Sequence, residues 1–244
     1  MGVNIGNELL AGHAAPNLFL PNFEAAVLAR LVPHLATRLP RWGGRFLFPD
    51  LLWRCPTSKN GPTLYLTFDD GPTAAMTDPI LRVLDRFDAR ATCFLVGAQA
   101  EDDPERVRRI ARAGHTVGSH TFTHPDPWRT SDAALRDELA RTTDLLQSLT
   151  GQAVRHLRPP YGRFTRAMRR WGREHGQHVV MWDVMPGDFL GMATQSSVEQ
   201  FVVRYARDGS VVVLHDNPIA PMTPAALETV LRYFTERGWR FAAL

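Results

Sequence analysis

Short runs of apolar and β-branched residues recur at regular intervals from Gly61 to Leu244. Such runs, bounded by glycine, proline and polar residues, are typical of buried strands. Strands are predicted over residues 64–68, 91–96, 115–119, 154–158, 178–183, 210–215 and 240–244. Between them, apolar positions repeat with the spacing of a helix. Helices are predicted over residues 78–88, 104–113, 131–149, 164–175, 196–207 and 224–237.

The ends of these helices carry capping residues. Asp103 stands before Pro104 at one predicted start, and Ser196 begins a Ser-Ser-Val-Glu sequence typical of a capping box. Gly151 and Gly176 follow two predicted ends, where glycine commonly stops a helix. Seven strands alternating with six helices predict an α/β fold with a parallel sheet, either closed as a barrel or open and doubly wound.

The first 60 residues follow a different pattern. Residues 1–22 are small and polar, so we expect a flexible segment, and residues 23–60 are expected to form an appendage packed on a domain spanning 61–244. Leucines repeat with helical spacing over 25–39, beside a basic stripe: Leu28, Leu31, Leu35 and Leu39, with Arg30, His34 and Arg38. A membrane-surface helix would also show this pattern. We favour a helix packed on the domain, because the apolar stripe is short and contains Pro33.

Composition and charge exclude several classes. The 244 residues are 44% hydrophobic and 22% charged, which is typical of a globular domain, and no apolar run is long enough to span a bilayer. Residues 61–244 contain 22 basic and 22 acidic side chains, so a nucleic-acid partner is not expected. Two cysteines, Cys55 and Cys93, exclude a disulfide scaffold. No secretory signal is recognisable, so we expect a protein that is cytoplasmic or peripheral to the cell envelope.

Unusual polar residues follow the predicted strands at their carboxyl ends. They lie in five segments: Thr67–Pro72 (TFDDGP), His120–His124 (HTFTH), Arg158–Gly162 (RPPYG), Trp182–Asp183 with Asp188, and His215–Asp216. In a parallel sheet these ends meet at one edge, where α/β proteins build their sites.

Two histidines and a carboxylate in these segments suggest a metal site. His120 and His124 are four residues apart in a turn, which alone is weak evidence, since surface loops often contain histidines. Asp70 supplies a third ligand and leaves a position open for water, as in catalytic zinc sites. Its neighbour Asp69 points in a different direction along the strand, so one carboxylate can hold metal while the other accepts a proton. An Asp-Asp-Gly-Pro sequence is also compatible with a simple turn.

Four of these motifs in this order, TFDDGP, HTFTH, RPPYG and VLHD, resemble the polysaccharide deacetylase family of metal-dependent carbohydrate esterases, which includes chitin and peptidoglycan deacetylases. The resemblance covers residues 61–244 and implies a distorted (β/α)7–8 barrel. It implies a hydrolase that removes N-acetyl groups, through metal-activated water, from an N-acetylated oligosaccharide or polysaccharide such as chitooligosaccharide or a peptidoglycan-like glycan.

The resemblance also implies roles for individual residues. Asp70, His120 and His124 would bind one divalent ion, expected to be Zn²⁺, with Co²⁺, Mn²⁺ or Ni²⁺ as alternatives. Asp69 would be the general base and His215 the general acid. Arg158 would orient the base, and the Tyr161 N–H would stabilise the oxyanion. The residues expected to contact the substrate are Pro159, Trp182 and Leu214, with Leu214 beside the acetyl methyl group.

One stretch departs from the family pattern. Where the family often has an aspartate that tunes the acid histidine, this sequence has Met185. Asp183 lies two residues earlier and, on a strand, would face the same side. Two interpretations are open: Asp183 substitutes as the partner of His215, or it only satisfies the backbone of a loop.

Three other functions are compatible with the same fold or with some of the same site residues. An O-acetyl carbohydrate esterase would use the same water on an ester, and a catalytically silent glycan-binding relative would keep only the fold. A metal-free amidohydrolase acting on a cyclic ureide is disfavoured by the complete ligand set. The sequence identifies neither the sugar nor an oligomeric state, and membrane association is not favoured.

Overall fold

Parallel strands form one curled sheet in the computed structural model, which describes residues 33–35, 37, 43–57 and 61–244. The sheet order is β5-β4-β3-β2-β1-β6, and β7 pairs with the start of β1. The strands are β1 Thr63–Gly71, β2 Ala91–Leu95, β3 Thr116–Ser119, β4 His156–Leu157, β5 His178–Val179, β6 Val211–His215 and β7 Arg240–Phe241. All the predicted strands are therefore confirmed, although those predicted at 154–158, 178–183 and 240–244 are only two residues long in the structure.

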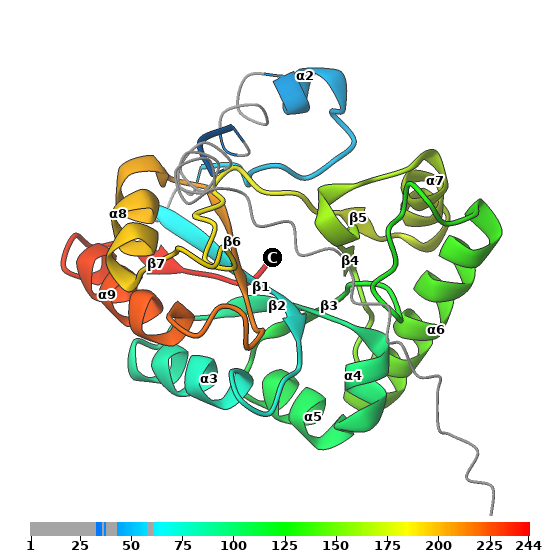
Figure 1. Cartoon of the computed structure of the whole chain (residues 1–244), viewed down its shortest axis with the longest axis horizontal. Helices are drawn as coiled ribbons and strands as arrows, with labels where there is room; N and C mark the ends of the chain where they lie inside the picture. The colour runs from blue at the N-terminus through cyan, green and yellow to red at the C-terminus, as the bar shows by residue number, and fades with distance from the viewer. Residues whose placement is uncertain (1–32, 36, 38–42, 58–60) are drawn as a thin grey trace, which may run out of the picture.

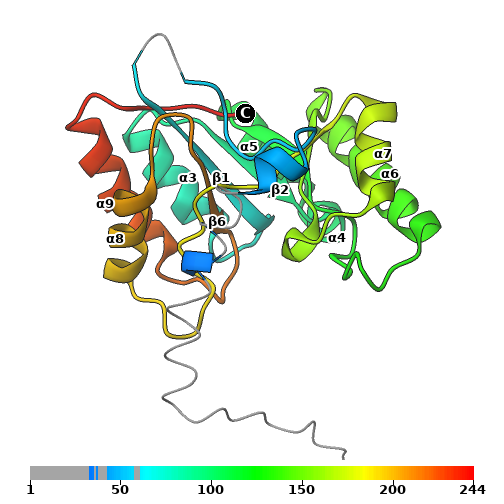
Figure 2. The ribbon, with the colours of Figure 1, turned by 90° about the horizontal axis from the view of Figure 1, so that it is seen from above.

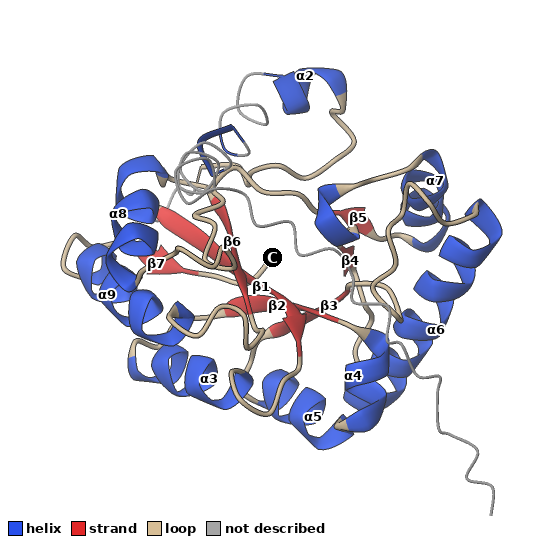
Figure 3. Ribbon diagram, in the orientation of Figure 1, coloured by secondary structure: helices blue, strands red, loops and turns tan. Residues whose placement is uncertain are grey.

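Helices surround the convex side of this sheet (Figures 1 and 3). They are α3 Thr77–Arg86, α4 Gly97–Asp102, α5 Pro104–Arg112, α6 Asp132–Thr150, α7 Arg166–His175, α8 Gln195–Tyr205 and α9 Thr223–Thr235. The short helix α2, Arg45–Leu47, lies apart from them, beyond the open side of the curl (Figure 1). The six predicted helices are confirmed to within two residues at each end. The short helix α4 was not predicted, because its six residues are too few to show an apolar period.

Three helix ends carry the expected caps, whereas Asp78 and Thr223, each followed by proline, lie inside α3 and α9 and form no side-chain cap. Asp103 accepts a hydrogen bond from Arg106 N at 3.0 Å, and Gly151 and Gly176 end their helices in the left-handed conformation. The capping box predicted from Ser196 is wrong. Helix α8 begins one residue earlier, so the box is formed by Thr194 and Ser197.

The gap between β5 and β6 is closed by residues 51–55 together with Val184, which pairs in parallel with Val212. Leu52 pairs in parallel with Val180, and Arg54 pairs in antiparallel fashion with Ser210. The backbone bonds are Leu52 N to Val179 O at 2.9 Å, Met181 N to Leu52 O at 2.8 Å and Cys55 N to Gly209 O at 2.9 Å. Residues 51–55, which were predicted to belong to an appendage packed on the domain, therefore pair with the barrel through their backbone.

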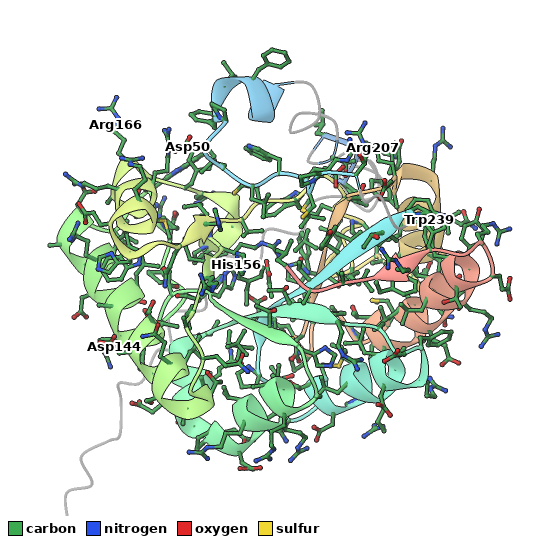
Figure 4. All side chains as sticks on the ribbon, turned by 180° about the vertical axis from the view of Figure 1, so that it is seen from behind. Asp50, Asp144, His156, Arg166, Arg207 and Trp239 are labelled. Carbon is green, nitrogen blue, oxygen red and sulfur yellow. The ribbon has the colours of Figure 1, made fainter. Side chains whose placement is uncertain are left out.

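The two faces of β1 have different surroundings. Leu64, Leu66 and Phe68 belong to the hydrophobic core between the sheet and helices such as α3 and α9 (Figure 2). Tyr65, Thr67 and Asp69 alternate with them and face the inside of the curl. Figure 4 shows His156 of β4 near the centre of the molecule, whereas Asp144, Arg166 and Trp239 lie at its edge. The inner face of β1 leads to the site described below.

Most of the N-terminal expectations lie outside the described residues. These are the flexible segment 1–22 and the helix 25–39, apart from residues 33–35 and 37, which are helical. His34 packs against Phe201, with ring centroids 5.1 Å apart, and accepts or donates a hydrogen bond at 2.9 Å with the Tyr205 hydroxyl. Within the described ranges, the structure contains no helix of the length and hydropathy that a bilayer crossing requires.

Candidate active site

Two adjacent carboxylates lie at the carboxyl end of β1. The pairing of β1 with β2 shifts register between Asp69 and Gly71, and Asp70 adopts a left-handed φ of 70°. Such a bulge re-aims the side chain that it contains. As a result Asp69 and Asp70 both approach His120, at 4.0 Å and 3.4 Å from its Nε2 atom.

The HTFTH turn after β3 brings the two histidines together. Thr121 and His124 have φ values of 66° and 57°, conformations that neighbouring groups must support. On one side, Gly97 N and Ala98 N of α4 donate to the carbonyls of Thr121 and Phe122. The result is a turn attached to the first residues of α4.

Glu138 of α6 holds the same turn from the other side. Its carboxylate accepts hydrogen bonds from the backbone N–H groups of Phe122 and Thr123, both at 2.7 Å, and from the Thr123 hydroxyl at 2.8 Å. The turn that presents His120 and His124 is therefore fixed by two helices.

Asp70, His120 and His124 have the geometry of a metal site. Their ligand atoms lie within 4.8 Å of one another, and Asp70 Oδ1 is 3.4 Å from Nε2 of each histidine. Two ligand atoms about 2.0–2.1 Å from a tetrahedral zinc ion lie roughly 3.3 Å apart, so the observed spacing fits. His120 Nδ1 lies 2.8 Å from the Arg158 carbonyl oxygen, which leaves Nε2 facing the site.

Electrostatics favour the metal-binding protonation states of Asp70 and His124. Burial raises the pKa of Asp70, but the hydrogen bond from His120 and the charges of His120, His215 and His124 outweigh it and hold the pKa well below its usual range. Burial and the neighbouring His120 lower the pKa of His124. Asn217 Nδ2 donates to Asp70 Oδ2 at 3.3 Å, on the oxygen opposite the one that faces the histidines. A carboxylate and neutral imidazoles are the forms that coordinate a divalent ion.

Asp69 is held by a buried ion pair. Arg158 is completely buried, and its Nη1 donates to Asp69 Oδ1 and to the Thr67 hydroxyl, both at 2.7 Å. Its Nη2 donates to the Met181 carbonyl at 2.9 Å. The guanidinium thus leaves Asp69 Oδ2 as the oxygen nearer to His120. This is the contact predicted for an arginine that orients the base.

The partner of His215 is Asp188, not Asp183. Nδ1 of His215 lies 2.8 Å from Asp188 Oδ1, and the His215 backbone N–H donates to Asp188 Oδ2 at 2.8 Å. Burial would lower the pKa of His215. The charge of Asp188 and its hydrogen bond, with Asp69 and Asp70 contributing, instead raise the pKa to about 9.

Asp183 satisfies backbone and hydroxyl donors away from His215. It accepts hydrogen bonds from Val211 N at 2.9 Å and from the Ser210 hydroxyl at 3.0 Å. The hypothesis that Asp183 tunes His215 is wrong, because the chain leaves regular strand geometry after Val179 and the period-two argument fails there. The alternative, a loop-supporting aspartate, describes its contacts.

The expected substrate-binding residues have different surroundings. Trp182 packs beneath the RPPYG turn, where a Cβ on Gly162 would come within 2.6 Å of its ring. Within that turn, Pro159 is buried and Tyr161 is 63% exposed. Leu214 was wrongly predicted: it pairs with Phe68, its side chain lies in the core between the sheet and the helices, and His215 faces the opposite side.

Sequence reasoning missed three supporting residues. Asp188 was noted only as a strand-end carboxylate, and Asn217 and Glu138 were not considered. Asn217 directly follows the VLHD motif, so its position was a usable signal. Glu138 lies mid-helix and 14 residues beyond His124, so no local pattern points to it.

Comparisons with known proteins agree with this geometry. A family model described as polysaccharide deacetylase matches residues 57–180, which include the first three motifs. The chain is 33% identical over 187 residues to the peptidoglycan-N-acetylglucosamine deacetylase of Bacillus cereus, covering 76% of this chain and 68% of that protein. It is 32% identical over 208 residues to the chitooligosaccharide deacetylase of Sinorhizobium fredii, covering 80% and 96%.

The fold is also similar to a solved structure, that of the Bc1960 peptidoglycan N-acetylglucosamine deacetylase in complex with a hydroxamate-type benzamide. The TM-score is 0.76 at 31% sequence identity, and the match covers 80% of this chain and 91% of that one. The curled sheet is thus shared between the two proteins.

Proposed function

This chain belongs to the polysaccharide deacetylase family, and we propose that it hydrolyses the acetamide of an N-acetylated glycan with the residues gathered at the ends of β1, β3 and β6. Relatives named as peptidoglycan and chitooligosaccharide deacetylases support this class of substrate. The observation that carries the proposal is one cluster, in which the ligand set Asp70, His120 and His124 stands beside two further acid–base groups, Asp69 and His215.

Deacetylases of this family depend on a metal, and we assign zinc to the Asp70, His120 and His124 set. Two imidazoles and one carboxylate favour zinc over the harder cations, which prefer oxygen ligands alone. When bound, the ion supplies Lewis acidity, which polarises the acetyl carbonyl and makes water more acidic.

Asp69 is placed to act as the general base. Its Oδ2 atom is the carboxylate oxygen nearer to His120 Nε2, at 4.0 Å, while Arg158 occupies Oδ1 at 2.7 Å. A water between the base and the substrate would give its proton to Asp69 as its oxygen attacks the acetyl carbon. The backbone N–H of Tyr161 would donate to the carbonyl oxygen as negative charge develops on it.

His215 is placed to act as the general acid. It pairs with Asp69 across β1 and β6, so both side chains face the inside of the curl. With its pKa raised to about 9 by Asp188 and the other nearby carboxylates, against the effect of burial, the imidazole is protonated at neutral pH. It would give that proton to the nitrogen as the C–N bond breaks, releasing acetate and a free amine.

Acetate release tests the proposal. Zinc-loaded protein is incubated with chitooligosaccharides, peptidoglycan fragments and O-acetylated xylooligosaccharides, and released acetate is measured. We expect release from the acetamides, with none from protein stripped by a chelator. Release from the esters alone would favour the O-acetyl esterase, because the same water attacks either carbonyl. Binding without release would favour a silent relative, against which the complete set of acid, base and ligands argues.

A further inference from the structure

Exposed aromatic side chains lie next to His124, one of the two histidines of the metal site. Tyr161 is 63% exposed, and its ring lies 4.7 Å from that of His124. Trp128, in the loop that follows the HTFTH turn, is 68% exposed. We call Trp128, Tyr161 and Arg163 the aromatic platform.

Arg163 joins the two rings into one surface. Its guanidinium carbon lies 5.0 Å from the Trp128 ring centroid and 5.6 Å from the Tyr161 ring centroid. Asp126 forms an ion pair with the same guanidinium. Cation–π contacts of this length stabilise the stacked arrangement, so the platform is contiguous from His124 to Trp128.

Hydrogen bonds hold the loop that carries Trp128. Asp126 accepts a hydrogen bond from Trp128 N on its side chain at 3.1 Å, and its carbonyl accepts from Arg129 N at 3.0 Å and from the Thr130 hydroxyl at 2.8 Å. The indole N–H of Trp128 points to the Phe164 carbonyl at 3.4 Å. The ring is therefore oriented by groups on both sides, which lowers the entropy cost of binding.

Folding does not account for the exposure of Trp128. The hydrophobic clusters of the described residues do not include it, whereas Trp53 and Trp171 are buried in one of them. A large exposed aromatic surface beside a catalytic centre marks a binding site. An indole face is apolar and rigid, and its counterpart on a glycan is the C–H face of a pyranose ring.

We propose that the aromatic platform binds the sugar next to the one that is deacetylated, with its ring stacked on Trp128 and its hydroxyls facing Arg163. This inference rests on the proposed function. The contacts run from His124 through Tyr161 and Arg163 to Trp128, and the sugar next to one whose acetamide lies at the metal site would occupy this path. The enzyme would thus act on oligosaccharides in preference to a single N-acetylated sugar.

Kinetics test the platform through Trp128→Ala. We expect kcat/KM for a chitotetraose to fall at least ten-fold, mainly through KM, while acetate release from a small aryl acetate stays unchanged. Trp128→Phe should restore part of the loss. The matched control is Phe46→Ala, which removes a 90% exposed ring on α2 and should change neither activity. An unchanged tetrasaccharide rate, or an equal loss on the aryl acetate, would overturn the proposal.

Calorimetry separates this inference from the proposed function. The ligand is chitotetraose, and the protein is the Asp69→Asn variant with and without Trp128→Ala. Binding that weakens at least ten-fold with Trp128→Ala supports the platform, even if the wild-type protein releases no acetate and the proposed reaction fails. Equal affinity in the two proteins, or no binding to either, would overturn the platform even if wild-type deacetylation is observed.

Discussion

Asp188 contacts His215 at two points, with one carboxylate oxygen 2.8 Å from the Nδ1 atom and the other 2.8 Å from the backbone nitrogen. Thr223 donates its hydroxyl to the second oxygen at 2.8 Å, so Asp188 itself is fixed. These two contacts fix the orientation of the His215 ring and leave its Nε2 as the atom that can exchange a proton with substrate.

Replacing Asp188 should move the alkaline limit of activity. A carboxylate beside an imidazole favours the charged form, so Asp188→Asn should lower the pKa of His215 from about 9 toward its ordinary value. The acid would then lose its proton at lower pH, and the alkaline limb of kcat/KM against pH should shift down by about 1–2 units. The profile is measured on chitotetraose with constant metal loading.

Asp183→Asn is the control, since Asp183 bonds Val211 N and the Ser210 hydroxyl instead. The Asp183→Asn substitution should lower the free energy of unfolding by about 1–3 kcal/mol, the range for weakening a buried hydrogen-bond acceptor. It should not shift the alkaline limb of the kcat/KM profile. A limb that moves with Asp183→Asn and not with Asp188→Asn would reverse this assignment.

The ion pair between His215 and Asp188 also predicts how the stability of the folded protein depends on pH. The pKa of His215 is raised in the folded protein, so its contribution is complete below the unfolded value of about 6.5 and is lost as pH rises through about 9. The difference in melting temperature between wild type and Asp188→Asn should therefore be largest near pH 6 and shrink above pH 9, where only the bonds of Asp188 to the His215 N–H and the Thr223 hydroxyl still distinguish the two proteins. A difference that is constant from pH 6 to pH 10 would mean that the pair does not titrate as described.

Asp69 and Asp70 should separate catalysis from metal binding. Asp69→Asn should keep the metal and lower turnover by at least about 100-fold, because it removes the base and leaves the three ligands. Asp70→Ala or His120→Ala should lower metal occupancy as well. Metal content per chain is measured with kcat for each variant. A metal-free Asp69→Asn protein would show that the roles of the two aspartates are exchanged.

The strands and helices could be predicted from sequence because burial of one face makes apolar residues recur at a regular spacing. In β1, buried apolar residues alternate with residues on the other face, and β6 is a continuous apolar run. Helix α5 begins with an aspartate cap followed by proline. The metal ligands were predictable because parallel strands end at one edge, which brings Asp70, His120 and His124 together. Asp188 was not assigned, because Val184–Phe189 is irregular and its side-chain directions depend on tertiary contacts.

The closure of the barrel escaped prediction for a related reason. Residues 51–55 (LLWRC) show no alternation, and they pair with Val180 and Ser210, next to β5 and β6 and more than 120 residues away in sequence. Their burial depends on those distant partners, with Leu51 5% and Trp53 8% exposed. A local pattern cannot report such a contact.

Truncation tests this closure. A chain that begins at Thr57 loses Leu52 and Arg54 from the gap between β5 and β6, and with them the Trp53 side chain, whose burial is worth about 3–5 kcal/mol. We expect it to be insoluble or to melt at least about 10 °C lower than a chain that begins at Gly43. Equal melting temperatures for the two would show that the domain is complete without residues 51–55.

Glu138 should control metal affinity without touching the metal. Its carboxylate accepts three hydrogen bonds from Phe122 and Thr123, inside a turn whose Thr121 and His124 backbones are left-handed. Glu138→Ala removes these acceptors, so the turn should relax and His124 should leave its position opposite Asp70. Losing such outer support typically costs 10–100-fold in metal affinity. We expect that loss in a zinc competition titration, with a parallel fall in activity at limiting zinc and recovery at high zinc.

Two further variants separate positioning from charge. Glu138→Gln keeps one carbonyl acceptor for the turn and removes the negative charge, so it should retain most of the affinity if hydrogen bonding is what matters. Glu199→Ala on α8 removes a glutamate that accepts a hydrogen bond from Gln195 at the surface, and it should leave the zinc affinity unchanged. Unaltered zinc affinity in Glu138→Ala would show that α4 alone holds the turn through Gly97 and Ala98. Equal losses in the alanine and glutamine variants would instead mean that the charge of Glu138, rather than its acceptors, stabilises the site.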